Sequence, residues 1–197
     1  PERQQLEQAL APLAATFALQ LPPMHWQEQD DEDWSLSWKQ HWQPDPVGQR
    51  LLILPAWLDL PPEHADRLVI RMDPGSAFGT GSHPTTRLCL EAIEQLAAER
   101  GQPGAPDLGP LRVADLGCGS GILGIAALLQ GANSVAAADT DSLAVRATRD
   151  NAAQSGFADR LRVELGSVER LAELLEGRPA DLLLCNILAP VIEALSP

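Results

Sequence analysis

The chain has 197 residues, enough for one good-sized domain or for one domain with a smaller partner. Its formal charge of −13 excludes the basic surface that non-specific nucleic-acid binding needs, and it suits either simple solubility or a lysine-rich protein partner. No apolar run reaches membrane-spanning length. The three cysteines are widely spaced and show neither metal-ligand spacing nor a disulfide framework. We therefore expect a soluble, cytoplasmic, monomeric protein without a metal and without a membrane or nucleic-acid partner.

The first part of the chain predicts a helix. Apolar residues recur at helical spacing over residues 2–16. An acidic run at 27–33 follows, which we interpret as a solvated loop, with recognition of a basic partner as the alternative. Trp34, Trp38 and Trp42 are spaced four residues apart, so they predict one face of a further helix, packed in a core rather than used as a ligand platform.

A domain boundary is predicted after the next strand. Residues 51–54 form an apolar run typical of a strand, and the proline-rich segment 61–66 indicates a linker. Residues 1–60 are thus predicted to be a small α+β domain, and residues 67–197 a second domain.

In the second domain, predicted strands and helices alternate. The strands are expected at 68–70, 111–115, 134–139, 160–165 and 180–185, and the helices at 85–100, 122–130, 142–155 and 167–176. Such alternation indicates an α/β fold with a parallel sheet, whose ligands bind at the carboxyl ends of the strands.

A glycine-rich turn directly follows the strand at 111–115. Gly117 and Gly119 permit a tight turn and a close approach of backbone amides to a ligand. Asp139 ends the next strand, where a carboxylate can accept hydrogen bonds from both hydroxyls of a ribose. Together these residues predict a ligand that contains adenosine.

Residues 119–124 also match the dinucleotide pattern G-x-G-x-x-G, so a nicotinamide-dependent dehydrogenase is the rival hypothesis. Two observations weigh against it. Asp115 precedes the first glycine, where a carboxylate can meet a ligand's ammonium but would repel a pyrophosphate. In addition, a full helix and a second glycine-rich loop precede this strand.

That second loop, residues 73–86, reads DPGSAFGTGSHPTT and ends at a helix start. It contributes Thr80, His83 and Thr86, and the exposed amides of the helix start favour a carboxylate, such as that of a methionine moiety. His83 has a capping or turn role as its alternative. Asn186, after the strand at 180–185, places an amide in the crevice, with a structural role as a buried polar group as its alternative.

With these motifs together, the sequence resembles the PrmA family, methyltransferases of ribosomal protein L11, from about residue 33 onward. The family loop D-P-G-x-A-F-G-T-G-T-H-P-T-T is matched with Ser82 in place of a threonine. The family's D-x-G-C-G-S-G-I-L run is matched at 115–123, and its A-N-I-L motif is matched with Cys185 in place of the alanine.

The resemblance implies S-adenosylmethionine as cofactor, with contacts from Thr86, Gly117, Asp139 and Asn186. It implies N-methylation of lysine side chains and of the N-terminal amine of L11, with Asn186 orienting the amine, and an N-terminal domain that captures this substrate. No residue stands out as a strong general base.

The implied fold is a Rossmann-like class I methyltransferase sheet of seven strands. Only four predicted strands follow the loop at 73–86, so we expect a fragment that lacks the C-terminal strands and part of the N-terminal domain. A catalytically inactive S-adenosylmethionine-binding module is therefore a further hypothesis.

Overall fold

The computed structural model describes residues 2–25, 38–73, 79–102, 105 and 107–195. The chain divides into two compact units, Pro1–His41 and Trp42–Pro197. In the first unit, helix α1 (Glu2–Thr16) confirms the predicted helix. The acidic run lies outside the described residues, as does Trp34, and the short 3-10 helix η1 (Trp38–His41) is what the structure describes of the predicted tryptophan-bearing helix.

The second unit begins with a three-stranded sheet. Strand β1 (Asp45–Val47) pairs antiparallel with β2 (Leu51–Pro55), and β2 pairs parallel with β3 (Leu68–Met72). The 3-10 helix η2 (Pro62–His64) lies in the connection between β2 and β3. The segment predicted as an interdomain linker thus joins two strands of one sheet.

The compact unit starts at Trp42, upstream of the boundary predicted at residue 60. The reason is hydrophobic burial. Every residue of β2 is buried, and Leu51 and Ile53 share one core with Ile70 of β3 and with the helices that follow. An apolar strand of this kind cannot leave the core without exposing its side chains to water.

A four-stranded parallel sheet forms the rest of the unit, in the order β6-β5-β4-β7. Its strands are β4 (Arg112–Leu116), β5 (Ser134–Asp139), β6 (Leu161–Leu165) and β7 (Leu182–Leu184). The helices are α3 (Pro84–Arg100), α4 (Ile122–Leu129), α5 (Ser142–Gln154), α6 (Val168–Leu174) and α7 (Ala189–Leu195). Each predicted strand and helix of residues 67–185 is confirmed within a few residues at its ends.

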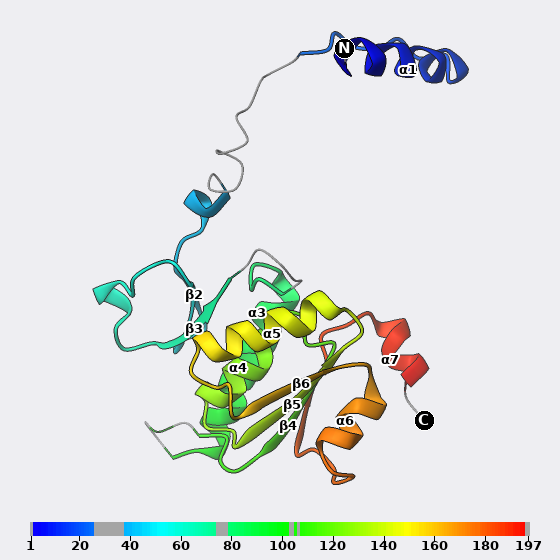
Figure 1. The fold of residues 1–197 in the computed structure, drawn as a ribbon. Helices are drawn as coiled ribbons and strands as arrows, with labels where there is room; N and C mark the ends of the chain where they lie inside the picture. Colours follow the sequence, from blue (N-terminus) through cyan, green and yellow to red (C-terminus); the bar gives the residue numbers. More distant parts are fainter. Residues whose placement is uncertain (1, 26–37, 74–78, 103–104, 106, 196–197) are drawn as a thin grey trace. The chain divides into compact units, whose positions relative to one another are not determined.

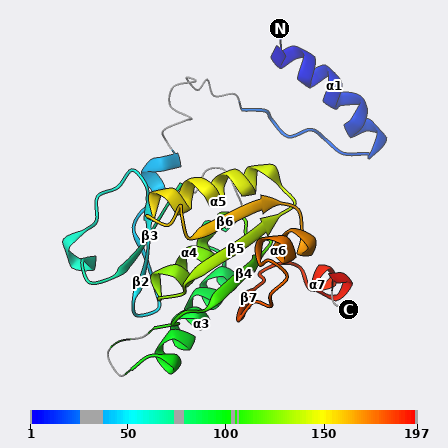
Figure 2. The same ribbon diagram turned by 60° about the horizontal axis from the view of Figure 1, so that its bottom comes forward.

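Both faces of this sheet are covered, as Figures 1 and 2 show. Val113 and Val135 point into the larger core, which α3, α4 and α5 cover. Their neighbours Ala114 and Ala136 point to the opposite face, where α6 packs with Leu171. This alternation follows from the period of two along a strand. The result is a layered α/β fold with a parallel sheet.

Strand β7 is an edge of the sheet, because β4 is its one neighbour among the described strands. Leu183 on this edge is 58% exposed.

Among the residues that the structure describes, no helix combines the length and the hydropathy needed to cross a bilayer.

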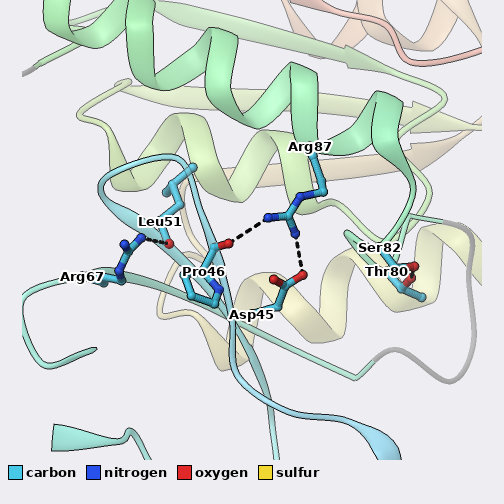
Figure 3. A network of polar contacts seen from close by, with 7 residues as sticks. All are labelled: Asp45, Pro46, Leu51, Arg67, Thr80, Ser82 and Arg87. Atoms are coloured by element: carbon cyan, nitrogen blue, oxygen red, sulfur yellow. Dashed lines mark hydrogen bonds and ion pairs between the residues drawn. The ribbon is translucent and has the colours of Figure 1, made fainter. Parts of the chain in front are cut away.

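Helix α3 is tied to the first sheet by polar contacts (Figure 3). Arg87 donates from Nη1 to Asp45 Oδ2 at 2.6 Å and from Nη2 to the carbonyl of Pro46 at 2.8 Å. About two turns further along α3, Glu94 accepts from the backbone amides of Gln49 at 2.9 Å and Arg50 at 3.2 Å. These contacts fix α3, whose first turn carries Thr86.

Candidate functional site

A cavity of about 620 Å³ lies at the carboxyl ends of β4, β5 and β7. Neighbouring parallel strands end at the same edge of a sheet, so residues far apart in the sequence meet there. The polar residues around the cavity come from the glycine turn, the end of β5, the segment after β6, the start of α3 and the segment after β7. They include Gly117, Gly119, Asp139, His83, Thr85 and Asn186.

The glycine turn joins β4 to α4. Gly117, Gly119 and Gly121 have positive φ angles of 70°, 56° and 80°, a region that side-chain-bearing residues rarely adopt. The amide of Gly117 donates to the carbonyl of Ala138 at 2.8 Å, which holds the turn against the end of β5. A Cβ on Gly117 would collide with Cγ2 of Ile187. Any residue larger than glycine at position 117 would therefore have to displace Ile187.

Asp139 stands at the end of β5 and lines the cavity. Its Oδ2 accepts from the amide of Gly119 at 2.9 Å, and its Oδ1 accepts from the amide of Asp141 at 3.0 Å. An ionised carboxylate offers about four lone-pair sites, so two further hydrogen bonds can still be accepted. The backbone contacts thus orient the carboxylate and leave acceptor capacity toward the cavity.

Thr86 and Asn186 meet although they lie in distant parts of the sequence. Asn186 Nδ2 donates to Thr86 Oγ1 at 3.3 Å. Thr86 is only 1% exposed and does not itself line the cavity, whereas Asn186 does. Thr86 therefore affects the cavity indirectly, by accepting a hydrogen bond from the side-chain amide of Asn186.

His83 is the N-cap residue of α3, with its Nδ1 at 3.3 Å from the amide of Thr85 and 2.8 Å from Thr85 Oγ1. It combines this capping contact with a place in the cavity wall. Thr80 lies apart from the cavity-lining residues, and its Oγ1 is 2.9 Å from Ser82 Oγ (Figure 3).

Asp115 faces α4 rather than the cavity. Its side chain is 1% exposed, and Oδ2 accepts from the amide of Gly124 at 3.1 Å. Burial raises the pKa of this carboxyl to about 7, an effect that the Gly124 amide opposes and the charge of Asp139 reinforces. Asp115 is thus not among the residues that line the cavity, and its contact with a ligand's ammonium stays a prediction.

The three cysteines are free, and burial raises the pKa of each thiol. Cys118 is the most buried of them, next to the carboxyl of Asp115. Thiols of this kind are poor nucleophiles, since the thiolate is the reactive form. In the part of the chain that the structure describes, no group of three or more His, Cys, Asp or Glu residues could hold a metal ion.

Comparison with known proteins identifies the family. The family model described as "Ribosomal protein L11 methyltransferase (PrmA)" matches residues 1–197. The chain belongs to this family.

Two curated relatives carry the same description. The protein named "Ribosomal protein L11 methyltransferase" from Parasynechococcus marenigrum (strain WH8102) is 71% identical over 197 residues, which cover 100% of this chain and 65% of the relative. Its namesake from Synechococcus sp. (strain RCC307) is 64% identical and is covered to 62%. The chain thus spans somewhat less than two thirds of the length of these family members.

A solved structure supports the fold. The ribosomal protein L11 methylase of Lactobacillus delbrueckii subsp. bulgaricus is 35% identical, with a TM-score of 0.62 over 78% of this chain and 71% of that one. This relative and the observed layers confirm the predicted class I methyltransferase fold.

Membership of the PrmA family argues against the dehydrogenase hypothesis. Asp115 adds little to this argument, because its carboxylate faces α4 rather than the cavity. The structure also places at the cavity residues that the sequence did not single out, some of them inside the predicted motifs. They are Thr85, Thr140, Gly166 and Ser167, together with an apolar wall of Leu116, Ile187, Leu188, Val191 and Leu195. For Thr140, Gly166 and Ser167 the usable signal was their position directly after a predicted strand.

Proposed function

We propose that the cavity is the S-adenosylmethionine site of a protein N-methyltransferase whose substrate is ribosomal protein L11. The observation that carries the proposal is the convergence of Gly117, Gly119, Asp139 and Asn186 at one cavity. The substrate is inferred from the names of the family members. It belongs to the proposal because this chain spans 62–65% of their length.

The residues around the cavity fit such a ligand. A volume of about 620 Å³ lies within the range of small-molecule sites. Gly117 and Gly119 line the cavity and carry no side chain, so a ligand can approach their backbone closely. Asp139 retains acceptor capacity for the two hydroxyls of a ribose.

When bound, S-adenosylmethionine supplies an electrophilic methyl group on its sulfonium. The chain's part is to position and desolvate the acceptor amine. Because Asn186 Nδ2 donates to Thr86, its Oδ1 is the atom that can accept an N–H of the amine and so orient the lone pair. The apolar wall with Ile187 and Leu188 favours the neutral amine, since a free lysine has a pKa near ~10.4 and burial disfavours its charged form.

The net charge supports a basic protein substrate. A formal charge of −13 attracts a lysine-rich partner at long range. We assign capture of that partner to the residues before Trp42, the part of the predicted 1–60 domain that lies outside the second compact unit. A monomeric state, a cytoplasmic location and the lack of a direct nucleic-acid partner stay predictions.

Transfer of tritium from the labelled methyl group of S-adenosylmethionine to purified L11 tests the proposal. We expect label on L11, with suppression by S-adenosylhomocysteine, and no label on an unrelated lysine-rich protein. Label on both proteins would contradict the assigned substrate. Binding of S-adenosylhomocysteine without any transfer would favour the catalytically inactive cofactor-binding module.

A further inference from the structure

Helix α5 presents a buried stripe of polar side chains where apolar ones are the rule. Thr148 and Asn151 lie in α5 and Ser155 is its half-buried C-cap residue, and the three follow one another at the spacing of one helical face. Thr148 is 0% exposed and Asn151 is 1% exposed. Buried polar groups are costly unless they are hydrogen-bonded, so their partners indicate what the stripe does.

Each member of the stripe bonds to backbone of another segment. Thr148 Oγ1 donates to the carbonyl of Gly119 at 2.9 Å. Ser155 Oγ accepts from the amide of Arg71 at 3.2 Å and donates to its carbonyl at 3.0 Å. The stripe therefore fastens α5 to the glycine turn at one end and to β3 at the other.

Asn151 sits between them and uses both ends of its amide. Its Nδ2 donates to the carbonyl of Ser120 at 2.9 Å, and its Oδ1 accepts from the amide of Asp73 at 3.0 Å. Ser120 Oγ in turn donates to the carbonyl of Gly79 at 2.6 Å. These bonds run without interruption from Asp73 through Asn151 and Ser120 to Gly79.

The chain of bonds joins two walls of the cavity. Ser120 belongs to the glycine turn, which contributes Gly117 and Gly119 to the lining. Gly79 belongs to the segment that leads into α3, which contributes His83 and Thr85. Asn151 does not line the cavity itself.

We propose that Asn151 is a positioning residue that sets the distance between the glycine turn and the segment leading into α3, and thereby the fit of the cavity to its ligand. The consequence for ligand affinity rests on the proposed function, whereas the consequence for the backbone does not. The structure offers variants that separate the two bonds. Asn151→Asp keeps an acceptor for Asp73 but turns a carboxylate oxygen toward the carbonyl of Ser120, and Asn151→Leu removes both bonds at similar volume.

The first measurement is amide hydrogen exchange of the ligand-free chain over residues 79–86. Asn151 makes no described hydrogen bond to these residues, so a change there must pass through Ser120 or Asp73. We expect faster exchange there in both variants and in Ser120→Ala, which breaks the bond to Gly79. Gln154→Ala, an exposed position on the same helix, is the matched control and should exchange as wild type does. Unchanged exchange over 79–86 in the Asn151 variants would overturn the proposal.

The second measurement is the Kd of S-adenosylhomocysteine by calorimetry, with the folded fraction determined by circular dichroism. We expect Kd to rise by roughly 10-fold, equivalent to about 1.4 kcal/mol, in Asn151→Asp and Asn151→Leu. A purely structural role would lower the unfolding temperature and leave the Kd of the folded fraction unchanged, which would overturn the proposal. If Asn151→Leu does not fold, Asn151→Asp and Ser120→Ala decide.

The two proposals fail differently. If the wild-type chain binds no S-adenosylhomocysteine, the proposed function fails, and the exchange of the ligand-free chain still decides the role of Asn151. If the wild type binds it and the variants bind it equally well, the positioning role fails alone.

Discussion

Asp115 is a carboxylic acid in surroundings that solvate its charged form poorly. It is buried against α4, and the amide of Gly124 is the one hydrogen-bond donor recorded for it in the described structure. Its pKa is raised to about 7, against about 3.9 for an aspartate in water. The folded protein therefore holds a proton there under conditions in which the unfolded chain has lost it.

This proton makes stability depend on pH. Because the pKa is higher in the folded state, the contribution of Asp115 is complete below about pH 4 and is lost as the pH rises through about 7. We expect Asp115→Asn, whose amide oxygen can still accept from Gly124, to remove a decline on the order of 4 kcal/mol between these pH values. Urea denaturation across this range measures it. Asp150→Asn, on the exposed side of α5, is the control, and parallel pH profiles for wild type and Asp115→Asn would contradict the account.

Asp139 is the residue whose loss should affect cofactor affinity most. Replacing Asp139 by alanine would remove two charge-assisted hydrogen bonds to the ribose of the cofactor, each worth about 1.5–3 kcal/mol. We expect Asp139→Ala to weaken binding of S-adenosylhomocysteine by roughly 100-fold or more and also to lower the unfolding temperature, because the amides of Gly119 and Asp141 lose their acceptor. Calorimetry measures the affinity, with exposed Asp159→Ala as the control. An affinity equal to that of wild type would remove Asp139 from the site.

At the scale of elements, local patterns predicted the strands and helices of residues 67–185, because apolar spacing and glycine turns are local features. The domain boundary was not predictable in this way. A proline-rich segment reads as a linker, yet here it connects β2 to β3, and strand pairing between them is long-range information. The burial of all five residues of β2 follows from that pairing.

The site was predictable where a motif ends a strand, as at Gly117 and Asp139. The orientation of the Asp115 side chain was also predictable from the sequence, since the period of two along a strand puts it on the same face of β4 as Val113, toward α4. The contact between Asn186 and Thr86 was not, because it joins residues 100 positions apart. Asn151 gave one usable signal, a polar residue on the apolar face of a helix.

The turn between β1 and β2 depends on α3. Glu94 accepts from two backbone amides there, so Glu94→Ala leaves both donors without that partner. We expect a loss of about 1–3 kcal/mol in the free energy of unfolding, measured by urea denaturation. Glu91→Ala, exposed on the same helix, should change stability little. Equal stabilities of the two variants would show that the contact contributes nothing.

At the scale of the whole molecule, the two candidate boundaries predict different truncations. A chain that starts at Trp42 keeps both sheets, whereas a chain that starts at Pro61 loses β1 and β2. We expect the first to unfold cooperatively and to bind S-adenosylhomocysteine as the full chain does, but to transfer no methyl group to L11. We expect the second to lose its cooperative thermal transition, because Leu51 and Ile53 belong to the main core. A stable second truncation would restore the boundary at residue 60.

We expect S-adenosylmethionine to bind in the cavity at the ends of β4, β5 and β7. Calorimetric titration of the wild-type chain with S-adenosylhomocysteine and, separately, with NAD tests it most directly. We predict saturable binding of S-adenosylhomocysteine at one site per chain and no binding of NAD. Binding of NAD without binding of S-adenosylhomocysteine would contradict the claim and restore the dehydrogenase hypothesis.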